Sequence, residues 1–388
     1  MANIIDYLKW RGDLSFKNDP FNEVDNLILC QLTYTDFSCV PGIDKGFVSI
    51  KDAHKKYFEV YPEEEVRSRS TFLGRSVLIL DDLVQTKRYE NMKIGYYRNF
   101  ISKDQVGQFV AVTYMIDDLV YVVFGGTDHS LVGWKEDFYF SYSSGTMSQL
   151  MAVDYLKEMS ALVEGEFFLG GHSKGGNLAI YALLFSDEAI RSRIKKVYAN
   201  DSPGFTNDLA IKEDFEKIKG KISLLIPQSS VVGLLMEHTV KAEIVRADAK
   251  LIYQHDPLSW QLIGNAFIRE EKLSDDAIFV NKALSQWIED VPFDKRKEAV
   301  DGVFYCLEAA KAATFIELHE GGLNSVKEVL QASKTLPKSQ YDLIVSLIGK
   351  FINQSKDLFI ENILDSVAQK KSSIQERFGD SLPQKNKI

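Results

Sequence analysis

The chain has 388 residues, a length that allows one large domain and a smaller one. Hydrophobic residues make up 45% and charged residues 26%, as in ordinary globular proteins, and the net charge of -9 weighs against a nucleic-acid or anionic-membrane partner. The N-terminus lacks the pattern of a secretory signal, and no apolar stretch has the ~18 residues that a membrane-spanning helix needs. The three cysteines, Cys30, Cys39 and Cys306, lack metal-site spacing, so we interpret them as reduced thiols of a cytoplasmic protein.

The first part of the chain, residues 1–90, has a mainly helical and irregular pattern. A helix with one apolar face is predicted there by Leu27, Ile28, Leu32 and Tyr34. We expect this segment to pack on the remainder of the protein.

Strand patterns begin near residue 92. The segments 94–97 and 108–114 are rich in β-branched and aromatic residues, which predicts two strands. The continuous apolar run 119–124 is typical of a strand that is buried on both faces.

Helical and strand patterns then alternate along the chain. Helices are predicted at 147–163 and 177–185, and strands at 166–170, 194–199, 221–226, 243–245 and 250–253. This alternation predicts an α/β fold with a mostly parallel sheet and helices on both faces.

Past about residue 258 the strand patterns stop. Helical spacing occurs in the segments 277–288, 297–312, 326–332 and 343–359. The pattern therefore divides the chain into an N-terminal segment, 1–90, a core, 91–260, and a helical C-terminal region, 261–388. The spacing leaves open whether this last region is a separate domain or a cover over the sheet.

One short stretch predicts a catalytic nucleophile. Gly171, Ser173 and Gly175 match the pattern G-x-S-x-G, with a strand pattern before them and a buried-helix pattern after them. Strand, sharp turn and helix form the nucleophile elbow, which presents a serine hydroxyl at the edge of the sheet. The alternative is a glycine-rich turn with an ordinary surface serine.

A serine nucleophile needs a base, and the best candidate is His255. It follows the last predicted strand, on the loop from which hydrolases of this fold supply their histidine. The alternatives are that His255 only caps the following helix, or that His238 is the base.

The acid that orients the base is predicted to be Asp201. The loop 226–231, where an acid is usually found, contains no carboxylate, whereas Asp201 stands at the carboxyl end of the preceding strand. Asp201 could instead only organise the Pro-Gly turn that follows it. Asp256 ranks lower because it is adjacent to the base and points elsewhere.

Two backbone N–H groups are candidates for the oxyanion hole. One belongs to Lys174, the residue after the nucleophile, and the other to Thr127, which follows a buried strand and two glycines. The glycine pair could also be a plain turn. The Lys174 side chain is expected either near the mouth of the site, where it would favour an anionic substrate, or in solvent.

At these residues the chain resembles the class 3 lipase branch of the α/β-hydrolases. That family has an R-G-T type motif, then a tryptophan and an aspartate, then G-H-S-x-G-G. This sequence has Gly125-Gly126-Thr127, Trp134, Asp137 and the elbow, with Gly125 in place of the arginine. The motifs G-H-S-K-G-G-N-L-A, N-D-S-P-G-F and Q-H-D-P-x-S-W more closely resemble those of an uncharacterised bacterial lipase-like family with a domain of unknown function. The resemblance covers residues 90–260 and implies a hydrolase fold and a serine nucleophile, but no substrate.

These observations favour a cytoplasmic serine hydrolase that cleaves a small or lipid-like acyl ester without a metal or organic cofactor. The alternative is a catalytically inactive hydrolase fold with a binding or regulatory role. The same triad also serves acyl transfer and amide cleavage, which the sequence does not separate.

Overall fold

The computed structural model describes most of the first 278 residues and parts of the remainder: 2–69, 76–128, 131–143, 145–206, 213–238, 240–249, 251–275, 277–278, 281, 293–309, 322–338 and 341. The chain divides into two units, Met1–Val300 and Asp301–Ile388, each described by itself. The helices predicted at 277–288 and 343–359 lie largely or wholly outside the described residues.

A nine-stranded sheet forms the centre of the first unit, in the order β1-β2-β3-β4-β5-β6-β7-β8-β11. The strands β4 to β8 run parallel, whereas β1 to β4 pair antiparallel and β11 pairs antiparallel with β8. Their bounds are Phe47–Ser49 (β1), Lys93–Ser102 (β2), Gly107–Ile116 (β3), Leu119–Phe124 (β4), Glu166–His172 (β5), Ile194–Asn200 (β6), Ile222–Pro227 (β7), Glu243–Val245 (β8) and Arg269–Glu270 (β11).

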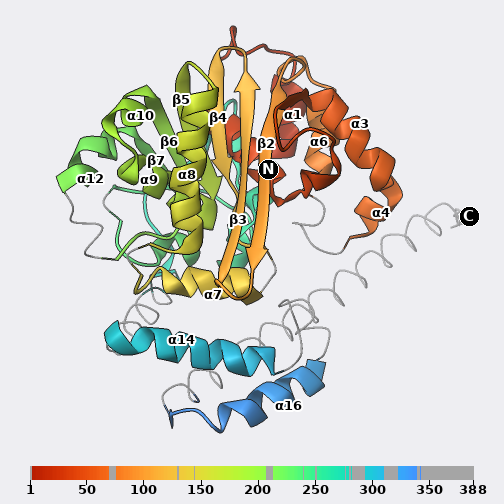
Figure 1. The fold of residues 1–388 in the computed structure, drawn as a ribbon. Coiled ribbons are helices and arrows are strands. Elements are labelled where there is room, and N and C mark those ends of the chain that lie inside the picture. Colours follow the sequence, from red (N-terminus) through yellow and green to blue (C-terminus); the bar gives the residue numbers. More distant parts are fainter. Residues whose placement is uncertain are drawn as a thin grey trace, which may run out of the picture. The chain divides into compact units, whose positions relative to one another are not determined.

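Each strand from β1 to β8 lies beside the strand that precedes it in the sequence. Right-handed crossovers between parallel strands that advance in one direction place their helices on one face of the sheet. Accordingly α8 (Met147–Leu162) packs on β3, and α9 (Lys174–Phe185) packs on β4, β5 and β6. In Figure 1 these green helices, with α10 (Glu188–Arg193) and α12 (Glu213–Ile218), lie to the left of β2 and β3.

The other face of the sheet is covered by the N-terminal part of the chain. Helix α2 (Glu23–Gln31) contacts β4, β5 and β6, and α1 (Ile4–Arg11) contacts α2. Figure 1 shows α1, α3 (Ile50–Val60), α4 (Glu63–Ser68) and α6 (Leu78–Val84) in red and orange to the right of the strands. The sheet therefore has helices on both faces, and the topology confirms the predicted α/β-hydrolase fold.

The two apolar layers explain the continuous hydrophobic strands. Along β3, Val110, Val112 and Tyr114 belong to the buried cluster on the N-terminal side, whereas Phe109 and Ala111 belong to the cluster beneath α8 and α9. Because successive side chains of a strand point to opposite faces, a strand between two helical layers must be apolar at nearly every position.

Near the end of the first unit, the predicted strand at 250–253 is wrong. Leu251–His255 forms a 3-10 helix, η5, followed by a second one, η6 (Pro257–Ser259). The Trp260 indole N–H donates to the Gln254 carbonyl (2.8 Å), and this bond folds the segment back on itself. The prediction that strands stop after residue 258 is also wrong. The hairpin strands β9 (Leu262–Ile263) and β10 (Ala266–Phe267) follow, and then β11.

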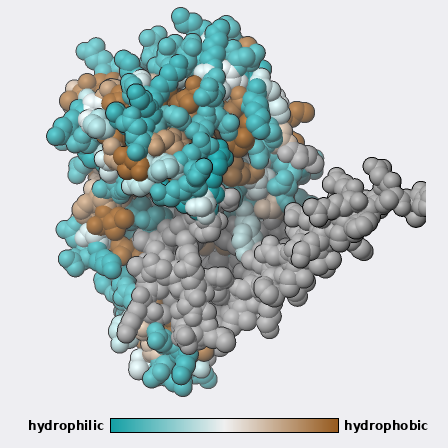
Figure 2. Space-filling view, turned by 90° about the vertical axis from the view of Figure 1, so that its right-hand side faces the viewer, coloured by the Kyte–Doolittle hydropathy of each residue, from teal (hydrophilic) through white to brown (hydrophobic). Residues whose placement is uncertain are grey.

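The remaining described elements are four 3-10 helices and three α-helices: η1 (Leu32–Tyr34), η2 (Phe37–Cys39), η3 (Lys219–Lys221), η4 (Val232–Leu234), α7 (Leu131–Tyr139), α14 (Phe293–Glu308) and α16 (Gly322–Ser333). Helix α16 lies in the second unit. The face seen in Figure 2 is mainly hydrophilic in the described part, with hydrophobic residues alone or in small groups, as is usual at a protein surface.

Candidate active site

Ser173 is the single residue between β5 and α9, and its backbone is strained. Its φ is 58° and its ψ is -132°, a region that non-glycine residues rarely occupy and that costs ~1–3 kcal/mol. The Ser173 N–H donates to the Asn200 carbonyl (2.8 Å), and the Ser173 carbonyl accepts from the Gly176 N–H (3.0 Å). These bonds hold the turn in the predicted elbow geometry, at the N-terminus of a buried helix.

The glycines of the motif are required by close backbone contacts. A Cβ on Gly171 would lie 2.1 Å from the Gly175 carbonyl carbon, and one on Gly175 would lie 2.1 Å from the Phe124 carbonyl oxygen. Neither neighbour is a side chain that could move away. The G-x-S-x-G pattern thus follows from the contact between the turn, its own helix and the end of β4.

His255 and Asp201 are in direct contact. The His255 Nδ1 lies 2.6 Å from Asp201 Oδ2, and the Asp201 side chain is almost fully buried. The second oxygen, Oδ1, accepts from the Ser230 hydroxyl (2.5 Å) and from the Gly233 N–H (3.1 Å). Both carboxylate oxygens are therefore fixed, and Nε2 of His255 is left as the atom that can accept a proton.

The elements around the elbow bring this pair close to Ser173. Asp201 directly follows β6 and Asn200, whose carbonyl holds the Ser173 N–H. His172, the residue before Ser173, donates from its Nε2 to the His255 carbonyl (2.9 Å). The three residues predicted as a triad thus converge at the carboxyl ends of β5 and β6.

The two alternative residues have other surroundings. Asp256 accepts the Leu258 N–H (2.9 Å) and caps η6. The buried Nε2 of His238 has no hydrogen-bond partner among the described residues, and burial lowers the pKa of this imidazole. The Oδ2 atom of Asp201 contacts His255 rather than His238.

Thr127 stands where β4 has ended, and its side chain is held by α7. The Thr127 hydroxyl donates to Asp137 Oδ2 (2.6 Å), which leaves the Thr127 N–H as the candidate oxyanion donor. The other carboxylate oxygen of Asp137 is buried and has no partner among the described residues. Burial raises the pKa of Asp137 to about 7, and the positive charge of Lys174 opposes this shift.

The Lys174 side chain is neither at the mouth nor in solvent, contrary to both expectations. It is fully buried, and its Nζ donates to the Gln108 carbonyl (2.7 Å), to Gln108 Oε1 (2.5 Å) and to Glu136 Oε2 (3.2 Å). Glu136 also accepts from the Gln108 N–H (3.0 Å) and from the N–H and hydroxyl of Ser148 (2.9 and 2.6 Å). The residue after the nucleophile is therefore anchored to β3 and α7 directly, and to α8 through Glu136.

Sequence reasoning did not identify Tyr34 as part of this region. Its hydroxyl lies 2.8 Å from Nδ1 of His172. A Cβ on Gly126 would lie 2.1 Å from the same hydroxyl and 2.8 Å from the His172 carbonyl oxygen. The residue before Thr127 is therefore glycine because Tyr34 and His172 occupy the space.

Neither a metal-binding cluster nor a membrane-spanning helix occurs in the described part of the chain. It contains no group of three or more His, Cys, Asp or Glu side chains arranged to hold a metal ion. None of its helices is both long enough and apolar enough to cross a bilayer.

Comparison with known families and curated proteins gives one match. The model of the family described as Mbeg1-like matches residues 83–305, which is more than half of the chain. Comparison with curated protein sequences finds no match.

Three lipases illustrate the likeness to solved structures. M37 lipase is 12% identical with a TM-score of 0.35, over 54% of this chain and 68% of that one. The Rhizomucor miehei lipase propeptide complex is 16% identical with a TM-score of 0.34, over 56% and 65%. Lip2 lipase from Yarrowia lipolytica is 10% identical with a TM-score of 0.33, over 65% and 86%.

Proposed function

Given that the chain belongs to the Mbeg1-like family and has a lipase-like α/β-hydrolase fold, we propose that it is a serine hydrolase that cleaves an acyl ester. The observation that carries this proposal is the 2.6 Å contact between His255 Nδ1 and Asp201 Oδ2, next to a serine held at a φ of 58°. A turn that needed no reactive hydroxyl would have no reason to keep a strained serine beside an oriented imidazole.

The proposed reaction has two halves. Ser173 Oγ attacks the ester carbonyl carbon while Nε2 of His255 takes the hydroxyl proton, and Asp201 holds Nδ1–H and stabilises the resulting imidazolium. The N–H groups of Thr127 and Lys174 donate to the oxyanion of the tetrahedral intermediate.

Collapse of the tetrahedral intermediate breaks the ester bond. The leaving alcohol takes the proton from His255, and the acyl group stays on Ser173. Water then gives its proton to His255 and attacks the acyl-enzyme, which releases the carboxylic acid and restores the serine hydroxyl.

We propose a small or lipid-like acyl ester as the substrate and residues 91–260 as the catalytic core. We also propose a cytoplasmic location. The support for it is that all three cysteines, Cys30, Cys39 and Cys306, are unpaired, as is usual in a reducing compartment.

A fluorophosphonate probe tests this proposal directly, because it labels only serines that an adjacent base has activated. We expect peptide mapping to find the label on Ser173 of the wild type, and none in Ser173→Ala or His255→Ala. The matched control is Ser186→Ala, at the other end of α9, which removes a buried hydroxyl that donates to the Ala182 carbonyl and should leave labelling unchanged.

The Asp201→Asn variant tests the acid. We expect its labelling rate to fall by ~10³–10⁴, because an asparagine favours the wrong imidazole tautomer. Folded wild-type protein that takes up no label would contradict the proposal and indicate the non-catalytic binding role instead.

A further inference from the structure

We propose that Tyr34 and His172 are positioning residues for the base, and that His172 acts only as a neutral imidazole with its proton on Nε2. This inference rests on the proposed function, because it assigns His255 as the residue that is positioned. Neither Tyr34 nor His172 takes a proton from the substrate. Together they fix the backbone from which the catalytic imidazole projects.

The tautomer of His172 follows from its two partners. Nε2 lies 2.9 Å from the His255 carbonyl oxygen, which can only accept, so Nε2 must carry a proton. Nδ1 lies 2.8 Å from the Tyr34 hydroxyl, which can donate to it. When the Tyr34 hydroxyl donates to Nδ1, the ring carries a single proton, on Nε2.

A neutral His172 matters because of the ring beside it. The centroids of the His172 and His255 rings are 4.4 Å apart, with 35° between their planes. In the proposed reaction His255 becomes positively charged, and a second imidazolium at this distance would oppose that step. Burial and the neighbouring His255 lower the pKa of His172, which keeps it neutral.

The charged and titratable groups around the pair come from several elements. His172 is contacted by Tyr34 from η1 and by His255 from η5. Burial raises the pKa of the Tyr34 phenol, and the Cys30 thiol and the carboxylates of Asp137, Asp256 and Asp128 raise it further. Tyr34 therefore keeps its proton and remains a donor to His172.

The Tyr34 hydroxyl also packs against Gly126. A Cβ on Gly126 would lie 2.1 Å from this hydroxyl, so only glycine fits there, and Thr127 is the next residue in the chain. One phenol thus contacts the histidine that holds the base and the loop that leads to the oxyanion donor.

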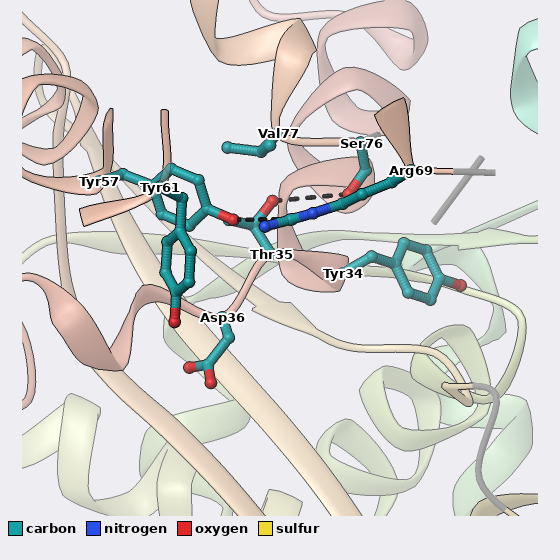
Figure 3. Close-up of a pocket in the computed structure, with 8 residues that line it drawn as sticks. All are labelled: Tyr34, Thr35, Asp36, Tyr57, Tyr61, Arg69, Ser76 and Val77. Carbon is teal, nitrogen blue, oxygen red and sulfur yellow. Dashed lines mark hydrogen bonds between the residues drawn. The ribbon is translucent and has the colours of Figure 1, made fainter. Parts of the chain in front are cut away.

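A pocket of about 200 Å³ lies on the opposite side of Tyr34. Figure 3 shows the Tyr34 hydroxyl pointing away from the other side chains that line this pocket, which include Tyr57 and Arg69. The Tyr57 hydroxyl accepts from Arg69 (3.1 Å), in place of any contact with His172. Tyr57 is therefore a matched control for Tyr34, with the same chemistry in the same pocket.

The test compares Tyr34→Phe with Tyr57→Phe by the rate of fluorophosphonate labelling between pH 5 and 8. Removing the Tyr34 hydroxyl keeps the ring but removes the donor to Nδ1 of His172. The neutral imidazole can then carry its proton on Nδ1 instead, where it no longer donates to the His255 carbonyl. We expect labelling at pH 7 to slow at least tenfold in Tyr34→Phe, whereas Tyr57→Phe and the wild type should share one labelling rate at every pH.

Two further measurements separate positioning from a general loss of structure. In Tyr34→Phe/His172→Gln the glutamine amide can donate to the His255 carbonyl and has no tautomer to select, so we expect the labelling rate to recover. Nitrogen-15 NMR of labelled histidines should find His172 with its proton on Nε2 in the wild type, and a mixture of the two neutral tautomers in Tyr34→Phe.

Wild-type labelling rate and an unchanged tautomer in Tyr34→Phe would overturn this inference while leaving the serine hydrolase intact. Absence of label on the wild type would instead contradict the proposed function. The NMR measurement then still decides whether Tyr34 fixes the His172 tautomer.

Discussion

The buried ion pair of Lys174 and Glu136 gives the sharpest stability prediction. Both side chains are completely buried, with Nζ 3.2 Å from Oε2. Lys174→Met leaves a buried carboxylate that keeps its donors from Gln108 and Ser148 but loses its counter-charge. Removal of one partner of such a pair costs ~3–5 kcal/mol of the free energy of unfolding. Glu136→Gln should cost a similar amount, because it leaves a buried ammonium group with neutral acceptors only.

The double variant Glu136→Gln/Lys174→Met removes both charges, so it should be more stable than the sum of the single effects predicts, by ~2–3 kcal/mol. Urea unfolding at pH 7, followed by circular dichroism, measures all four free energies. The control is the exposed pair of Lys195 and Glu166, 3.0 Å apart and 47% and 66% exposed, where Lys195→Met should cost below ~1 kcal/mol. If Lys174→Met costs no more than Lys195→Met, the reasoning about the buried pair is wrong.

Asp137→Asn should change how the free energy of unfolding depends on pH. The pKa of Asp137 is raised from 3.8 to about 7 in the folded chain, so between these values the folded chain keeps a proton that the unfolded chain loses. The wild type therefore becomes less stable as the pH rises from 3.8 to 7. From pH 5 to pH 8 the variant should gain ~2–3 kcal/mol relative to the wild type in urea unfolding, and parallel pH profiles would contradict this. Gly126→Ala should cost ~1–3 kcal/mol, because its Cβ would lie 2.1 Å from Tyr34 Oη. Gly46→Ala, whose Cβ meets nothing within 4 Å, should be close to neutral in the same assay, and equal costs would refute the packing argument.

The elbow could be predicted because its information is local. Gly171 and Gly175 meet across a single turn, so the G-x-S-x-G spacing lies within five positions of sequence, although Gly175 also contacts Phe124 at the end of β4. The structure also brings His255 and Asp201 together, with Nδ1 2.6 Å from Oδ2, although the strand predicted before His255 is a 3-10 helix. Their catalytic roles remain a proposal that the labelling experiment tests.

The partners around the elbow could not be predicted in the same way. Tyr34 reaches His172 across 138 positions, and Gln108 reaches Lys174 across 66. The hydrophobic periodicity of a single sequence does not predict such long-range contacts, because each contact depends on which strands become neighbours in the sheet. The Lys174 expectation was wrong because a lysine is normally exposed, and its burial here depends on Glu136 in a separate helix.

The error at 250–253 has a different physical cause. Leu251, Ile252 and Tyr253 have the β-branched and aromatic character of a strand, but strand propensity is weak evidence without a neighbouring strand. Side-chain bonds decide the conformation instead: the Gln254 amide accepts the Ser229 N–H (2.7 Å) and donates to the Ala249 carbonyl (2.7 Å). As a result, His255 lies at the end of a 3-10 helix rather than after a strand.

The order in which the sheet is laid down bears on how this chain folds during synthesis. Strands β1 to β8 add one beside the next, so the ribosome releases each strand next to a partner that already exists. Helix α2, by contrast, docks on β4, β5 and β6, and β6 ends at Asn200. At ~5–20 residues per second, α2 emerges on the order of 10–30 s before its docking surface is complete. For that interval the apolar residues of the N-terminal segment have no native surface to cover, which makes them the natural target of a chaperone on the nascent chain.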